Sequence, residues 1–160
     1  MKILKWILLA AFIFLLQTQF SSLKDYLNIT VTLVYYFGLR CLQNISARAY
    51  SVNKVVLEST AFGIAVGLAE DILSGPIIGP GVLSKGMVGF ITPVIFTNVV
   101  FRWTPLWGGI VLVILTVLDG VALAGSRVLF TGIQVSGVTV FHILVVQALM
   151  NIPFGIILKP

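Results

Sequence analysis

The chain has 160 residues, of which 59% are hydrophobic and 9% charged, and its mean hydropathy is +1.12. A soluble domain has about 45–50% apolar and about 25% charged residues, so this composition excludes an ordinary soluble protein. The net charge of +5 comes from basic residues that stand singly between apolar blocks, whereas a nucleic-acid-binding protein needs a contiguous basic patch. We therefore expect one transmembrane domain over residues 1–160, with the lipid bilayer as its solvent and no nucleic-acid partner.

Six segments are apolar enough to cross a bilayer. Each has about 17–21 residues, which as a helix matches a hydrocarbon core of about 30 Å. Because lipid offers the backbone no hydrogen-bond partners, even the β-branched segments should be helical. The sequence predicts an all-α integral membrane protein of about six transmembrane helices, at residues 3–20, 27–43, 55–73, 82–101, 106–125 and 138–158.

The first segment starts with MKILKW and has the basic start and apolar run of a signal peptide. The run continues as LLQTQF, without the small residues of a cleavage site, so we expect it to be retained as the first helix.

The positions of lysine and arginine predict the orientation. With the N-terminus inside, seven basic residues lie on the cytoplasmic side and three on the outer side, and an excess of basic residues marks the cytoplasmic side. Both termini should therefore be cytoplasmic. The seven are Lys2, Lys5, Arg40, Arg48, Lys54, Arg102 and Lys159, and the three are Lys24, Lys85 and Arg127.

Small residues recur at helical spacing in the segment 55–73. Such stripes let helix backbones approach closely in lipid. The stripe predicts either an ordinary contact within the chain or a face that docks the helix of a partner, and it consists of Ala61, Gly63, Ala65, Gly67 and Ala69.

Charged residues gather near the outer ends of three segments. A hairpin through the turn SGPIIGPG brings Asp71 and Lys85 to one depth, and Glu70 and Asp119 reach a similar level. Ionised groups at that depth are costly unless they are paired or wetted. We favour a structural ion pair of Asp71 with Lys85 that clamps the hairpin; the alternative is a polar pocket for a ligand or a proton. The turn residues are Ser74, Gly75, Pro76, Gly79, Pro80 and Gly81.

Motifs for catalysis are incomplete. Ser136 and His142 have the residue types of a serine–histidine dyad, but Gln134 stands where an intramembrane serine protease has glycine. The single Cys41 cannot form an internal disulfide, and no zinc-ligand spacing occurs. We expect no catalytic residue, no cofactor and no metal site, and we expect Cys41 to be buried.

The stretch GIAVGLAEDILSGPIIGPGVLSKGMVGFI, residues 63–91, resembles MreD, the rod shape-determining membrane protein of bacteria. In that family a glycine-containing helix leads into an aspartate, a Pro/Gly turn and a second helix with a glycine–aromatic pair. Glu70 and Pro80 depart from that pattern. The residues here that match it are Gly67, Asp71, Ser74, Gly75, Gly79, Gly89 and Phe90.

The resemblance implies a non-enzymatic scaffold subunit of the elongation machinery in the bacterial inner membrane. Such a subunit binds the single-span protein MreC and, through it, acts with MreB, RodA and a class B penicillin-binding protein. Whether it also forms a homodimer is left open by the sequence. It also implies a fold similar to the substrate-binding subunit of energy-coupling-factor transporters. A small-molecule-binding subunit of such a transporter is therefore the second hypothesis, although loop 21–26 is too short to roof a pocket.

Overall fold

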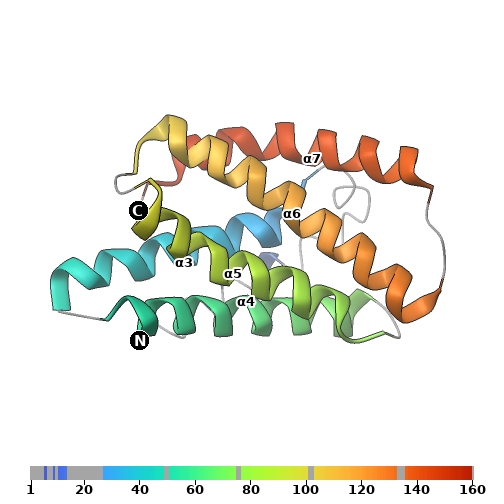
Figure 1. The fold of residues 1–160 in the computed structure, drawn as a ribbon, viewed down its shortest axis with the longest axis horizontal. Coiled ribbons are helices and arrows are strands. Elements are labelled where there is room, and N and C mark those ends of the chain that lie inside the picture. Colours follow the sequence, from blue (N-terminus) through green and yellow to red (C-terminus); the bar gives the residue numbers. More distant parts are fainter. Residues whose placement is uncertain are drawn as a thin grey trace.

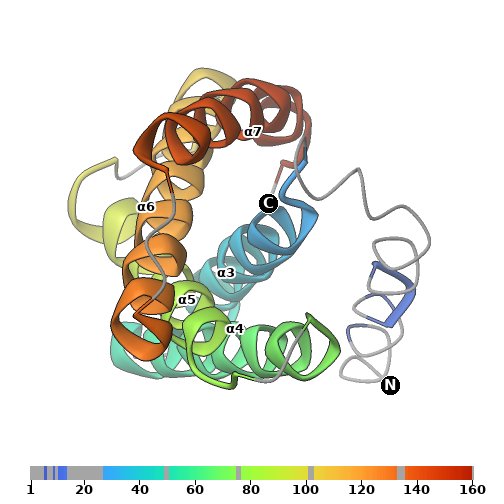
Figure 2. The same cartoon turned by 90° about the vertical axis from the view of Figure 1, so that its right-hand side faces the viewer.

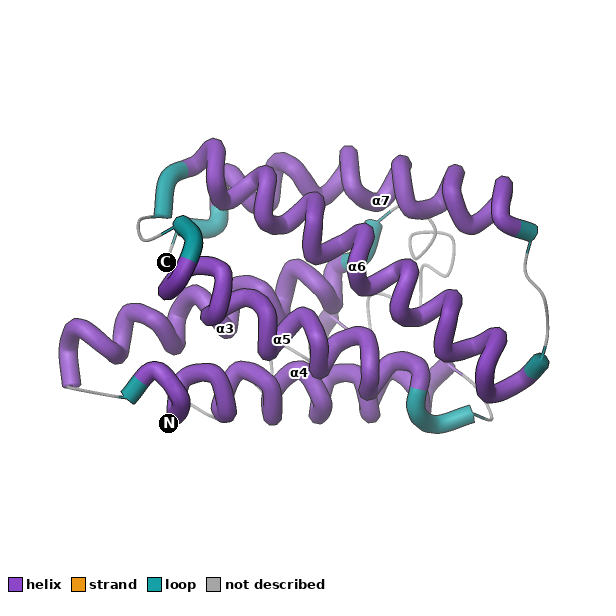
Figure 3. The backbone as a smooth tube through the Cα atoms, in the orientation of Figure 1, coloured by secondary structure: helices purple, strands orange, loops and turns teal. Residues whose placement is uncertain are grey.

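The computed structural model describes residues 6, 9, 11–13, 27–48, 51–74, 77–100, 103–132 and 136–159, except for the side chains at 44–48 and 131. Every regular element in these residues is an α-helix (Figure 3), which confirms the all-α prediction for the described part. The long helices are α3 (Ile29–Arg48), α4 (Val52–Ser74), α5 (Pro80–Asn98), α6 (Pro105–Thr131) and α7 (Gly137–Ile157).

Each predicted span from residue 27 onward corresponds to one of these helices. The largest differences are at the ends of α3, which continues to Arg48, and of α6, which continues to Thr131; α4 ends one residue past its predicted end, at Ser74. The predicted first span, residues 3–20, lies mostly outside the described residues, and those of its positions that are described are helical.

Three of the helices are long and apolar enough to span a membrane: α5, α6 over Pro105–Phe130, and α7. Large apolar side chains also project from the described surface, among them Leu106, Leu129 and Val138, which are 70–85% exposed. Such a surface suits lipid, so the chain is a membrane protein. Helices α3 and α4 carry more polar and charged residues, and their crossing of the bilayer stays a prediction.

The helices form a curved row with one helix inside it. Helices α4, α5, α6 and α7 follow one another in space as they do in sequence, and α3 lies on the concave side of the row, in contact with all four (Figures 1 and 2). At one end of the described chain, Trp6 packs against the rings of Phe37 and Phe62. The polar residues at the start of α3 form hydrogen bonds with side chains of α4, α6 and α7.

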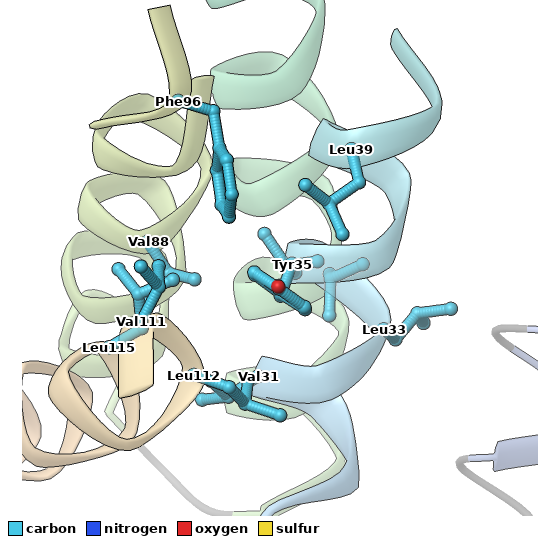
Figure 4. Packing of buried hydrophobic residues seen from close by; sticks show 11 residues of the cluster. Val31, Leu33, Tyr35, Leu39, Val88, Phe96, Val111, Leu112 and Leu115 are labelled. Carbon is cyan, nitrogen blue, oxygen red and sulfur yellow. The ribbon is translucent and has the colours of Figure 1, made fainter. Parts of the chain in front are cut away.

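The apolar core lies between α3, α5 and α6. Tyr35 and Leu39 of α3 face Val88 and Phe96 of α5 in this cluster (Figure 4). The hydroxyl of buried Tyr35 donates a hydrogen bond to the carbonyl oxygen of Gly108, 3.3 Å away in α6. A buried polar atom is costly without a partner, so this bond permits a tyrosine in the core.

Glycines allow the two tightest helix contacts. A Cβ atom at Gly63 or Gly67 of α4 would collide with the backbone of α5, at the carbonyls of Lys85 and Gly81. In the same way Gly108 of α6 lies against the backbone of α7 at residue 155. Close backbone approach is a main source of helix association in lipid, and here it fixes α4 on α5 and α6 on α7.

Candidate functional site

Lys85 is the centre of a buried charged cluster. Its side chain has no exposed surface, and its Nζ lies 2.9 Å from both carboxylate oxygens of Asp119 in α6. Glu70 of α4 lies on the other side, with its Oε2 3.3 Å from the same nitrogen. The Asp119 side chain is also fully buried, whereas that of Glu70 is 17% exposed. The cluster joins α4, α5 and α6 through one ammonium group.

The predicted ion pair between Asp71 and Lys85 is wrong. The carboxylate of Asp71 instead accepts hydrogen bonds from the backbone N–H groups of Gly79 and Gly81, both 2.8 Å away, and of Val82 at 3.2 Å. The first N–H groups of a helix have no partner within the helix, and its N-terminus carries a partial positive charge. Asp71 therefore caps α5, and Lys85 is left to the neighbouring carboxylates.

The local sequence of the turn explains how Asp71 reaches these N–H groups. Gly79 has a φ of 140°, a backbone conformation that side chains disfavour, and Pro80 begins α5 with the fixed φ of a first helical residue. The next residue is Gly81, and a Cβ atom at this position would clash with the Asp71 carboxylate. Ser74 ends α4, and the predicted turn residues Gly75 and Pro76 lie outside the described residues.

The predicted cluster of Glu70 with Asp119 does form, around Lys85. The partners that the sequence left unidentified for Glu70 are Lys85 and the hydroxyl of Thr30, whose Oγ1 lies 3.2 Å from Glu70 Oε2. Glu70 and Asp71 are adjacent on α4, so their side chains point in directions about 100° apart. This rotation places the Glu70 carboxylate beside Thr30 of α3 and Lys85 of α5, and the Asp71 carboxylate at the start of α5.

Two asparagines that were not predicted as site residues extend the charged cluster around Lys85. Asn28, just before α3, donates from Nδ2 to Asp119 Oδ2 at 2.8 Å, and its Oδ1 accepts from the N–H of Val31 at 3.2 Å. Fully buried Asn151 of α7 donates to the Oγ1 of Thr116 at 3.0 Å. The signal for Asn28 was its place before an apolar run, the pattern of a helix N-cap.

The helix face proposed from small residues divides in two. Gly63 and Gly67 are buried against α5, so this half is an internal contact. Ala61 and Ala65 are exposed, and Ala69 is half-buried. Only the alanine half remains available to a partner.

The other candidate residues have no shared site. Ser136 precedes α7 and His142 lies in its second turn; both are exposed, and no hydrogen bond joins them in the described chain. Cys41 is buried, as expected. Among the described residues no group of three or more histidines, cysteines and acids is placed to hold a metal ion.

An apolar cavity of about 200 Å³ lies away from the charges. Its lining includes Leu9 and Ile13 of the N-terminal segment, Leu33 and Tyr36 of α3, and Phe154 of α7. Neither Lys85 nor its carboxylate partners reach it. The charged cluster and the asparagines bonded to it link α4, α5, α6 and α7 to the start of α3. These bonds can hold the five helices in one arrangement.

No protein-family model matches the chain, and neither a curated protein nor a solved structure matches it.

Proposed function

We propose that this chain is a non-enzymatic scaffold subunit of the bacterial cell-elongation complex, held in the inner membrane with both termini in the cytoplasm. In this role it binds an MreC-like single-span protein and, through it, supports the MreB, RodA and class B penicillin-binding protein machinery. The resemblance of residues 63–91 to MreD is the basis of this proposal.

The proposal is supported by the structural roles of the residues that match the MreD pattern. Gly67 lets α4 and α5 touch, Gly79 makes the turn, and Asp71 caps the second helix. Each of these is a packing role that makes the hairpin rigid. A rigid wall presented to a partner is what a scaffold needs, so residues of this kind support a structural subunit.

The second hypothesis, a small-molecule-binding transporter subunit, has less support. A capturing pocket needs a few polar groups directed at the ligand. The charged groups Lys85, Asp119 and Asp71 are engaged with other groups of the chain, and the described cavity is lined mainly by apolar side chains. The scaffold therefore accounts better for the arrangement of the polar residues.

Ala65→Leu should weaken the binding of a tagged MreC-like protein. Ala65 is exposed on α4, and a bulky side chain there would keep a partner helix from close approach. Overpacking costs about 1–3 kcal/mol, which corresponds to about a 5–150-fold loss of affinity. The measurement is the fraction of tagged partner that co-purifies from membranes with equal amounts of folded protein.

Gly125→Leu is the matched control. Gly125 is an exposed small residue on α6 with open space where its Cβ would be, so the same bulk should leave co-purification unchanged. Equal binding by both variants would remove the α4 face from the proposal. Failure of Ala65→Leu to fold would instead mean that this alanine belongs to the core.

A further inference from the structure

The apolar cavity beside α3 is open to the surroundings of the bundle. It has a volume of about 200 Å³, is only partly enclosed, and lies between the N-terminal segment, α3 and α7. In a membrane protein such an opening faces the hydrocarbon of the bilayer. A void loses the contacts that its lining would otherwise make, so we expect an apolar group from the bilayer to fill it.

The two polar side chains in the cavity lining have partners within the chain. The hydroxyl of Thr32 donates to the carbonyl oxygen of Asn28, 3.4 Å away, and the hydroxyl of Tyr36 accepts from Nε of Arg40 at 2.8 Å. The other lining residues are leucine, isoleucine and phenylalanine. An apolar cavity of about 150 Å³ accepts a molecule of the size of benzene. This cavity therefore suits a slender hydrocarbon chain, whereas a whole helix, about 10 Å across, is too wide for it.

A basic residue lies at one end of the cavity. Ile29, Leu33 and Tyr36 line the cavity from successive turns of α3, and Arg40 is the next residue on the same face of the helix. Its guanidinium lies 5.2 Å from the centre of the Tyr36 ring, and Arg40 is exposed. Its hydrogen bonds go to neutral groups, the Tyr36 hydroxyl and the amide oxygen of Gln43 at 3.1 Å. These bonds do not neutralise its charge.

A second basic residue lies at the same end of the cavity. Leu158 lines the cavity just beyond α7, and exposed Lys159 follows it. Helices α3 and α7 run in the same direction along the bundle, so their last turns lie toward one end (Figure 1). At this end Trp6 packs against Tyr36, with ring centres 5.8 Å apart, and tryptophan and tyrosine are enriched where a bilayer meets water. The two basic residues therefore lie at the level of the lipid headgroups.

We propose that this cavity binds an anionic phospholipid, with one acyl chain in the cavity and the headgroup phosphate on Arg40 and Lys159. A guanidinium has five N–H donors and binds phosphate through two of them at once, and Tyr36 and Gln43 take only two. Basic pockets between membrane helices bind anionic headgroups in this way. With the predicted orientation the lipid belongs to the cytoplasmic leaflet. The site does not depend on which protein binds the chain.

Native mass spectrometry of the purified full chain in detergent tests the site, with titration of phosphatidylglycerol or of phosphatidylcholine with the same acyl chains. We expect the wild type to retain one phosphatidylglycerol in preference to phosphatidylcholine. Arg40→Gln combined with Lys159→Gln should weaken phosphatidylglycerol binding about 30-fold, about fivefold for each basic residue, and should remove the preference. Both residues are exposed, so this double variant should fold.

Lys54→Gln combined with Arg127→Gln is the matched control, because it removes the same number of charges from exposed positions outside the cavity lining. It should keep the preference for phosphatidylglycerol. A wild type without any preference would overturn the proposal. An equal loss in both double variants would also overturn it, because only the net charge would then matter.

Two further comparisons test the acyl chain. Inorganic phosphate and glycerol phosphate have the charged group without the chain, so neither should displace the lipid; displacement would overturn the proposal in favour of a free-phosphate site. Leu9→Trp should reduce the binding of both phospholipids because it fills the cavity, whereas Phe12→Trp, at an exposed position outside the lining, should not. Unchanged binding by Leu9→Trp, or its failure to fold while Phe12→Trp folds, would contradict an acyl chain in the cavity.

Discussion

Asp119→Ala should lower the free energy of unfolding by about 3–5 kcal/mol, because it leaves the ammonium of Lys85 buried without its main partner. Lys85 has no exposed surface, so water cannot replace the lost carboxylate, and Glu70 alone lies 3.3 Å away. Lys85→Ala should cost a similar amount, because it leaves the buried carboxylate of Asp119 without a counter-ion. The measurement is unfolding in detergent, by heat or by denaturant.

Lys159→Ala is the control for this prediction. Lys159 is an exposed lysine beyond the end of α7, and exposed substitutions usually change stability by less than about 0.5 kcal/mol. If Lys85→Ala were as mild as Lys159→Ala, the buried ion pair would not stabilise the fold.

Asp71→Ala should be the next most damaging change, with a loss of about 3 kcal/mol. A hydrogen bond to a charged group contributes about 1.5–3 kcal/mol; Asp71 accepts three from the start of α5, and two of the donors, Gly79 and Val82, are only half-buried and can be hydrated. Asp71→Asn should recover part of the loss, because its amide oxygen still accepts. Unfolding in detergent, with amide hydrogen exchange at Gly81, measures both effects.

The exposed neighbour Ile72 provides the comparison, since its side chain is 62% exposed and Ile72→Ala should be mild. The losses from Asp71→Ala and Lys85→Ala should add, because the two residues belong to separate sets of contacts. A double variant that is more stable than this sum would mean that Asp71 and Lys85 interact directly, which would contradict the structure.

The sequence was sufficient to predict where the helices lie. In lipid, a long apolar segment can make all its backbone hydrogen bonds within itself only as a helix. The predicted spans from residue 27 onward each correspond to one helix. The same reasoning placed Glu70, Asp71, Lys85 and Asp119 near one depth. The depth of a residue in the bilayer follows from its position along its own helix, so it can be predicted from the local sequence.

The pairing of the charges could not be predicted in the same way. It depends on how each helix is rotated about its axis and on which helix lies opposite, and both are set by packing across the whole bundle. Counting from the turn put Asp71 level with Lys85, but it ignored the free N–H groups of α5, which lie closer. Asn151 was missed because a single polar residue within an apolar helix has no local pattern that shows its partner, and the N-cap position of Asn28 did not show that its side chain also binds Asp119.

The small residues of α4 illustrate the same limit. Periodicity showed that they share neighbouring faces, but it could not tell which face meets α5. In the structure Gly63 and Gly67 face α5, whereas Ala61 and Ala65 face outward. The distinction follows from the direction in which the hairpin turns.

The central proposal is that the residues of the charged cluster serve the structure of the bundle, and that they support the binding of a partner only through that structure. It is tested by the neutral variant that combines Glu70→Gln, Lys85→Met and Asp119→Asn. Replacing a buried ion pair as a whole by uncharged residues of similar volume is often neutral for stability, so this variant should keep a stability close to that of the wild type, unlike Asp119→Ala.

The deciding measurement is the amount of tagged MreC-like protein that co-purifies with the folded neutral variant, relative to wild type. Our account predicts equal amounts. A neutral variant that folds with wild-type stability but retains no partner would contradict it, because the charges would then act in function directly.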